Sequence, residues 1–219
     1  CINENNQRQV ITYNQLYLQV AQCAAGLRAL GIIPGDRVAA LMPNTAHTVI
    51  AMLASTSLGA IWSSCSPDFG AEAVIDRLGQ IEPKVLFICD GHQYQGKKHS
   101  SREKIKLFHE AIPSLAQIVI CPNIQETMGE LPHTNTVYWD EFIQPETMCH
   151  FVSLPFNHPV YIMFSSGTTG KPKCIIHGAG GTLIQHLKEL GLHTDLKPQD
   201  NLMFYTTCGW MMWNWSVSA

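Results

Sequence analysis

Apolar and polar positions follow two patterns along the chain, one typical of helices and one typical of strands. Apolar residues recur at helical spacing from Leu16 to Leu30, and Thr12 and Gly31 suit the start and the end of a helix. Short apolar runs bounded by turn residues predict strands between such helices. We expect strands at residues 37–42, 60–65, 84–89, 117–121, 160–164, 174–177 and 201–206. We expect further helices at residues 45–58, 70–80, 101–112, 139–143 and 181–192.

This alternation predicts the fold class. Short apolar strands separated by helices are typical of a layered α/β domain whose mostly parallel sheet is covered on both faces. The polar stretch 90–100 predicts a loop, and residues 123–159 carry the weakest pattern. The length of 219 residues suits one large domain or two small ones.

Composition excludes several classes of protein. A hydrophobic fraction of 46% supports a buried core, and a net charge of −3 gives no general affinity for nucleic acid or anionic membrane. The eight cysteines form no CxxC pair and the ten histidines no HExxH motif, so we expect no metal site built from this chain. With no signal peptide and no membrane-length apolar run, we expect free thiols and a cytoplasmic location.

The candidate chemistry lies directly after the apolar run 160–164. Residues 165–173 combine four hydroxyls, two glycines and two lysines, a set that suits a polyphosphate. Gly167 and Gly170 allow backbone amides to approach an anion, and Lys173 supplies a positive charge. The hydroxyl donors are Ser165, Ser166, Thr168 and Thr169. Pro172 stiffens the exit of this loop and fixes the direction of Lys173.

Two common phosphate motifs do not describe this loop. A P-loop needs a glycine where the chain has Ser165 and a hydroxyl residue where it has Pro172. Gly178 and Gly180 begin a GxGxxG pattern, but Leu183 stands at the third glycine. The plain alternative is a surface turn rich in Ser, Thr and Gly. Lysines on both sides of a proline directly after an apolar strand favour the phosphate interpretation.

These nine residues resemble the signature loop of the adenylate-forming superfamily, which includes acyl-CoA synthetases, luciferase and peptide-synthetase adenylation domains. The similarity runs from about Thr12 to the last residue. Residues 61–70, 94–97 and 209–215 resemble the acetoacetyl-CoA synthetases in particular. The related acetyl-CoA synthetases have Val-Thr where this chain has Met211 and Met212. The family's usual glycine after the loop lysine is replaced by Cys174.

The resemblance implies a function and a set of partners. A carboxylate, with acetoacetate as first expectation, would attack the α-phosphate of ATP, and CoA would then take the acyl group from the adenylate. The residues 165–173 would hold the departing pyrophosphate together with Mg²⁺, and Lys173 would be the catalytic residue of this chain. The chain begins at Cys1 and ends just after a Trp-rich segment, so we expect residues 1–219 to be part of an N-terminal adenylation domain. The C-terminal domain of the same enzyme would be absent, leaving this part alone inactive.

Other residues allow both a functional and a structural interpretation. The resemblance suggests that Trp210 and Met211 shape the acyl pocket, although Trp and Met more often pack in a core. His177 suits a role in holding the loop, and Asp68 suits a turn. A cluster of basic side chains predicts an exposed, solvated surface, and a contact for the phosphates of CoA is the less favoured alternative. The cluster comprises Lys97, Lys98, His99, Arg102, Lys104 and Lys106.

Three hypotheses for function stay open from the sequence. The first is the ligase fragment, with acetyl-CoA or another short-chain acyl-CoA synthetase as its variant. The second is a phosphotransferase that uses the same loop and would make ADP instead of AMP and pyrophosphate. The third is a truncated module that binds nucleotide without catalysis.

Overall fold

A seven-stranded sheet forms the centre of the molecule in the computed structural model, which describes residues 2, 8–125, 135–166 and 170–218. The strand order is β7-β6-β3-β1-β2-β8-β9. The bounds are β1 Arg37–Leu41, β2 Ile61–Cys65, β3 Val85–Cys89, β6 Gln117–Cys121, β7 Thr136–Tyr138, β8 Pro159–Phe164 and β9 Cys174–Gly178. All neighbours pair in parallel except β8 and β9, which are antiparallel. The predicted α/β class with a mostly parallel sheet is therefore confirmed.

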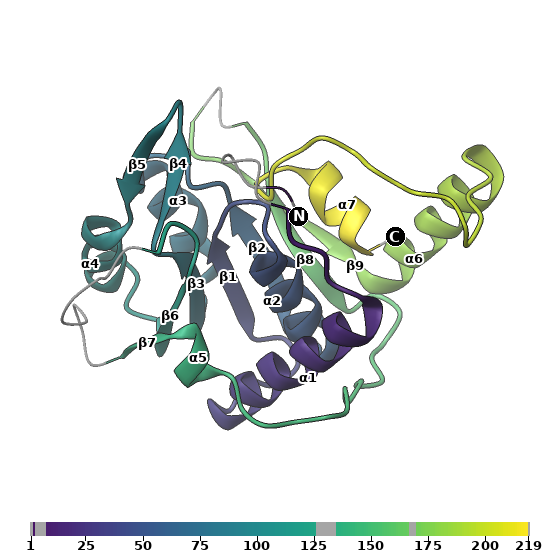
Figure 1. Cartoon of the computed structure of the whole chain (residues 1–219), viewed down its shortest axis with the longest axis horizontal. Helices are drawn as coiled ribbons and strands as arrows, with labels where there is room; N and C mark the ends of the chain where they lie inside the picture. Colours follow the sequence, from purple (N-terminus) through teal and green to yellow (C-terminus); the bar gives the residue numbers. More distant parts are fainter. Residues whose placement is uncertain (1, 3–7, 126–134, 167–169, 219) are drawn as a thin grey trace.

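Helices cover both faces of this sheet, as Figure 1 shows. One face packs against α1 (Tyr13–Ala29), α2 (Ala46–Ser57) and α5 (Trp139–Phe142), and the other against α3 (Ala71–Leu78) and α4 (Arg102–Ala111). Because side chains alternate along a strand, Val38 and Ala40 enter the first core and Ala39 and Leu41 the second. Burial on both faces explains why these strands read as continuous apolar runs.

Local signals explain the helix bounds. Thr12 caps α1, since its hydroxyl accepts from the amide of Gln15 and the Gln15 side chain accepts from the amide of Thr12. Gly31 follows the helix with φ of +75°, a conformation that glycine adopts without strain. Both predicted ends of this helix are therefore confirmed.

The predicted loop at residues 90–100 is wrong. It is a hairpin of β4 (Gly91–Tyr94) and β5 (Lys97–Ser100), in which Tyr94 pairs with Lys97. The two turn residues, Gln95 and Gly96, both have positive φ, 49° and 76°, as a two-residue hairpin requires. Gln is uncommon at the first position of such a turn, and the polar strands gave no apolar alternation.

The C-terminal third also differs from the prediction. The predicted strand at 201–206 is absent among the described residues; its side chains, such as Met203 and Tyr205, are mostly exposed and no strand pairs with them there. The expected helix at 181–192 is α6 (Ala179–His186) followed by a π-helix, Leu187–His193. A 3₁₀ turn, η1 (Gly79–Ile81), follows α3, and the Trp-rich segment forms α7 (Met211–Ser218).

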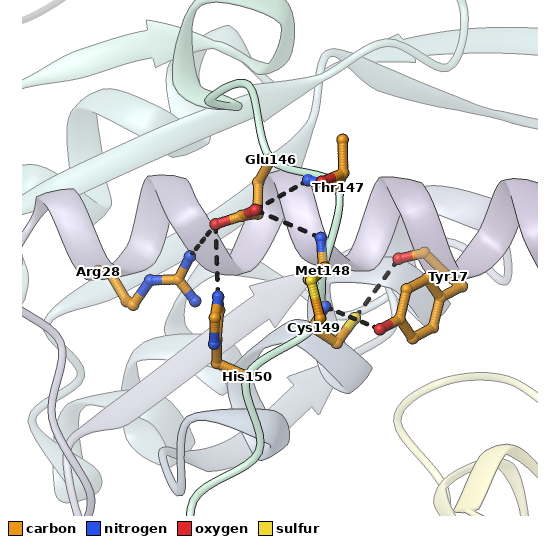
Figure 2. Close-up of polar contacts among 7 residues, drawn as sticks. All are labelled: Tyr17, Arg28, Glu146, Thr147, Met148, Cys149 and His150. Atoms are coloured by element: carbon orange, nitrogen blue, oxygen red, sulfur yellow. Dashed lines mark hydrogen bonds and ion pairs between the residues drawn. The ribbon is translucent and has the colours of Figure 1, made fainter.

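An extended segment, residues 144–152, runs along α1 and is held there by polar contacts (Figure 2). The Glu146 carboxylate lies 3.1 Å from Arg28 Nη2 and accepts from the amides of Thr147 and Met148. The Tyr17 hydroxyl accepts from the amide of Cys149, 3.1 Å away. These contacts fix the path of the chain from α5 to β8.

No helix in the described part of the chain combines the length and the apolar character needed to cross a bilayer.

Candidate functional site

The loop predicted to bind phosphate begins at a closed neck. Phe164 and Cys174 pair as the last residues of β8 and the first of β9. Beyond them, the Ser165 amide donates to the carbonyl of Lys173 at 3.0 Å, and the Lys173 amide donates to Ser165 Oγ at 2.9 Å. Ser165 therefore holds the two ends of the loop together, a role that the sequence did not indicate.

The structure describes the loop up to Ser166 and again from Gly170. Gly167, Thr168 and Thr169 lie outside the described residues, so their predicted hydrogen bonds to phosphate stay predictions. Ser166 and Gly170 are exposed, and Gly170 has φ of +145°, which favours glycine. The described residues on both sides of the tip thus face solvent, where a ligand can reach them.

The two lysines of the loop have different surroundings. Lys171 Nζ lies 3.7 Å from Asp76 Oδ1 of α3. The Lys173 side chain is exposed, and no residue in the described ranges forms an ion pair with its ammonium group. Among the described residues, the Lys171 ammonium is thus ion-paired with Asp76, whereas the Lys173 ammonium is not ion-paired.

The loop lies where α/β sheets usually bind their ligands. It follows the carboxyl end of β8, which pairs in parallel with β2. Ligands of open α/β sheets bind in the crevice beyond the carboxyl ends of the strands. The segment leading to α7 reaches this same edge: Cys208 Sγ lies 2.5 Å from the carbonyl of Met42, and Ser64 Oγ donates to the carbonyl of Cys208 at 2.5 Å.

A cavity of about 600 Å³ opens between β9, α6 and α7. Its wall is mostly apolar and includes Tyr161, Ile176, His177, Met211, Met212 and Trp215. Met211, Met212 and Trp215 thus line the same cavity, and the contact of Met211 with an acyl group stays a prediction. Trp210, 65% exposed, is not among the residues that line the cavity, so its substrate role stays a prediction.

Two histidines line this cavity from opposite elements. The His177 ring, on β9, packs against Tyr161 with ring centroids 5.1 Å apart. His186, on α6, is buried, and its Nε2 lies 2.8 Å from Ser218 Oγ of α7. Burial lowers the pKa of His186, so a neutral imidazole is favoured there. The predicted role of His177 in holding the loop stays a prediction.

Trp213 fixes the start of α7 against the sheet. It is 2% exposed, and its Nε1 donates to Asn44 Oδ1 at 2.8 Å, in the turn after β1. This contact joins residues 169 positions apart, so no local pattern could have indicated it. It places Met211 and Met212 at the cavity.

Asp68 and Lys104 have structural partners. Asp68 accepts a hydrogen bond from Ser66 at 2.8 Å within the turn after β2. Lys104 does not belong to an exposed basic group, because its ammonium donates to the carbonyls of Pro67 and Phe69 at 2.9 and 3.2 Å. Burial lowers the pKa of Lys104. Lys97 and Lys98 lie on the exposed strand β5.

Most of the described cysteines are buried. Every described cysteine is a free thiol, and burial raises the pKa of Cys65 to about 12 and that of Cys89 to about 11. Within the described residues, no group of three His, Cys, Asp or Glu is arranged to hold a metal ion.

The chain is similar in sequence and in fold to known CoA synthetases. The chain is 49% identical over 216 residues to acetoacetyl-CoA synthetase from Mus musculus, a match that covers 95% of this chain and 32% of that protein. It is 44% identical over 226 residues to malonamoyl-CoA synthetase from Penicillium aethiopicum, covering 100% of this chain and 31% of that protein. The solved acetoacetyl-CoA synthetase from Streptomyces lividans superposes with a TM-score of 0.92 at 42% identity, covering 99% of this chain and 33% of that one.

The chain thus spans about a third of the length of these relatives. Residues 1–218 match the family described as AMP-binding enzyme, and with this match over nearly its whole length the chain belongs to that family.

Proposed function

We propose that the longer protein containing this chain is an acid–thiol ligase that activates a short 3-oxo carboxylate, with acetoacetate as the first candidate. A carboxylate oxygen attacks the α-phosphorus of ATP, the bond to the bridging oxygen of the β-phosphate breaks, and pyrophosphate leaves. The CoA sulfur then attacks the acyl carbon, AMP leaves, and the thiol proton passes to solvent. Products are the acyl-CoA, AMP and pyrophosphate.

One observation carries this proposal: an exposed lysine without an ion-pair partner among the described residues follows a closed loop neck at the carboxyl edge of the sheet. The hydrogen bonds between Ser165 and Lys173 fix the backbone from which the Lys173 side chain extends. A cation held in place before the reaction stabilises charge that develops on the leaving group. Ser166 and the backbone around Gly170 are exposed beside it and available to phosphate oxygens.

ATP, Mg²⁺ and CoA are the cofactors and co-substrates that we infer. The triphosphate fits the loop, because Lys173 has no ion-pair partner among the described residues and Gly170 leaves open space. When bound, Mg²⁺ would supply charge stabilisation to the phosphates. The chain's own contribution is to bind and orient the triphosphate. The contact sites of CoA we place in the remaining part of the enzyme, together with its C-terminal domain.

The nature of the acid is inferred from the relatives and the cavity. Acetoacetyl and malonamoyl groups both carry a carbonyl at the third carbon of a short chain, and differ in a methyl against an amino group. The cavity beside Met211 is mostly apolar, which favours the methyl group of acetoacetate. The free thiols support our expectation of a cytoplasmic enzyme.

A panel of carboxylates tests the proposal on the full-length protein. Acetoacetate, malonamate, acetate and butyrate are each supplied with ATP, Mg²⁺ and CoA, and the nucleotide product and pyrophosphate are quantified. We expect AMP and pyrophosphate in equal amounts, with the highest kcat/KM for acetoacetate. Release of ADP would support the phosphotransferase instead. A preference for acetate or butyrate would contradict the 3-oxo assignment but keep the ligase.

A further inference from the structure

A second contact holds the neck of the phosphate loop from outside the loop. The side-chain amide of Gln80, in η1, donates to the carbonyl of Pro172 at 2.9 Å. Pro172 is buried and has no amide hydrogen, so its carbonyl is its only backbone group able to hydrogen-bond. The same Gln80 side-chain amide donates to the backbone carbonyl of Asp76 at 2.5 Å. The carboxylate of Asp76 forms the ion pair with Lys171, with Oδ1 3.7 Å from Nζ.

The turn that carries Gln80 is itself held by the sheet. Arg37, the first residue of β1, donates from Nε to the carbonyl of Ile81 at 2.6 Å and from Nη2 to that of Glu82 at 2.9 Å. Glu82 ends the turn in the left-handed region with φ of 46°. Ile81 is buried in the core between the sheet and α3. Gln80 is therefore presented from a fixed backbone rather than from a free loop.

These contacts place Pro172 between two fixed points. On one side, the Lys173 amide donates to Ser165 Oγ, and on the other the Pro172 carbonyl accepts from Gln80. Because a proline has a fixed φ, fixing its carbonyl also limits the direction in which the next residue leaves. The next residue is Lys173. A small displacement of a charged group from the reacting atoms is enough to lower the rate of an enzyme.

We propose that Gln80 is a positioning residue for Lys173. This inference rests on the proposed function, since it assigns to Gln80 the orientation of the group that stabilises pyrophosphate. Gln80 touches no substrate in this role and acts through the Pro172 carbonyl.

The test compares Gln80→Ala with a matched glutamine in the full-length protein. Gln117 is the control, because its side-chain amide donates to the backbone carbonyl of Asn135 at 2.6 Å on the β6 side of the sheet, away from the loop. We expect Gln80→Ala to lower kcat/KM for MgATP in ATP–pyrophosphate exchange about three- to tenfold, the effect of one neutral hydrogen bond. The KM for the carboxylate should stay unchanged, and Gln117→Ala should leave both constants unchanged.

The double variant Gln80→Ala/Lys173→Ala separates positioning from a general loss of structure. If Gln80 acts through Lys173, the double variant should be no slower than Lys173→Ala alone, because without the Lys173 side chain Gln80 has no ammonium group to position. Losses that multiply would overturn the proposal. Gln80→Glu, which keeps the shape but replaces the amide donor with an acceptor, should be at least as slow as Gln80→Ala.

Calorimetric titration with magnesium pyrophosphate gives a readout that needs no carboxylate. We expect weaker binding in Gln80→Ala and in Lys173→Ala, and wild-type binding in Gln117→Ala. Wild-type exchange and binding in Gln80→Ala, beside a slow Lys173→Ala, would overturn this inference and leave the proposed function intact. A wild-type protein without exchange for any carboxylate would instead overturn the proposed function, and this inference with it.

Discussion

The two sides of the sheet differ in how completely this chain buries them. On the β6-β3-β1 side, helices cover both faces, and residues such as Phe87 and Leu86 are fully buried. On the β8-β9 side, large apolar side chains remain exposed on β9, α6 and the π-helix; they include Ile175, Ile176, Leu183, Ile184 and Leu187. The candidate loop and the cavity both belong to this second side.

The two sides differ in whether this chain alone buries their apolar surface. The β6-β3-β1 side buries its own apolar surface, so its stability follows from local packing. The β8-β9 side leaves several large apolar side chains exposed on neighbouring elements, a feature typical of surfaces that contact other protein. Since the relatives are about three times as long as this chain, we expect segments outside it to cover this side.

The largest effect is expected from opening the buried side. Phe87 is fully buried and packs against Trp139 and Phe142, with ring centroids 5.9 and 5.5 Å away. Phe87→Ala should cost about 3–5 kcal/mol of unfolding free energy in urea denaturation of the 219-residue chain, because it leaves a cavity. Leu183→Ala, on the exposed side, should change it by less than about 0.5 kcal/mol. Equal losses of unfolding free energy in Phe87→Ala and Leu183→Ala would contradict the difference between the two sides of the sheet.

A smaller effect is expected where α7 is attached to the sheet. Trp213→Phe removes the hydrogen bond to Asn44 and part of a buried ring, so we expect a loss of about 1–3 kcal/mol. Trp210→Phe is the matched control, since Trp210 is 65% exposed and its change should be nearly neutral. A destabilisation by Trp210→Phe as large as that by Trp213→Phe would contradict this account of α7.

The smallest effect concerns Glu146, beside α1. Hydrogen bonds from the amides of Thr147 and Met148 lower the pKa of this carboxyl, and the nearby Arg28 and His150 act in the same direction. The ionised Glu146 carboxylate stabilises the folded chain. This contribution is complete above the carboxyl's ordinary pKa of 4.5 and is lost as pH falls through the lowered pKa. Glu146→Gln should therefore lose less stability than wild type between pH 7 and pH 3 in urea titrations. Glu110→Gln, exposed on α4, should follow the wild-type curve.

Much of the buried side could be predicted from the sequence. Strands such as β1 and β3 are apolar runs between turn residues, and Thr12 and Gly31 mark the ends of α1 with ordinary capping chemistry. The hairpin at Gly91–Ser100 was missed because its strands are polar and its turn uses Gln95 at positive φ. Residues 201–206 include apolar β-type side chains, but among the described residues no strand pairs with them.

The candidate site could be predicted only in part. The composition of residues 165–173 predicted a phosphate loop, and the family resemblance predicted a pocket role for Met211; both roles stay predictions. The contacts that fix the loop and α7 are between residues far apart, as with Gln80 and Pro172 or Trp213 and Asn44. Such pairs leave no periodic signal, and their donors are ordinary side chains. Only the fold brings them together.

The central claim is that Lys173, and not Lys171, faces the phosphates of ATP. The most direct measurement is ATP–pyrophosphate exchange by the full-length protein with acetoacetate, comparing Lys173→Ala with Lys171→Ala. We expect Lys173→Ala to lose at least about tenfold, which is ~1.4 kcal/mol of transition-state stabilisation. Lys171→Ala should stay within about threefold of wild type, because Lys171 forms an exposed ion pair with Asp76. Equal losses in the two variants, or an unchanged rate in Lys173→Ala, would contradict the account.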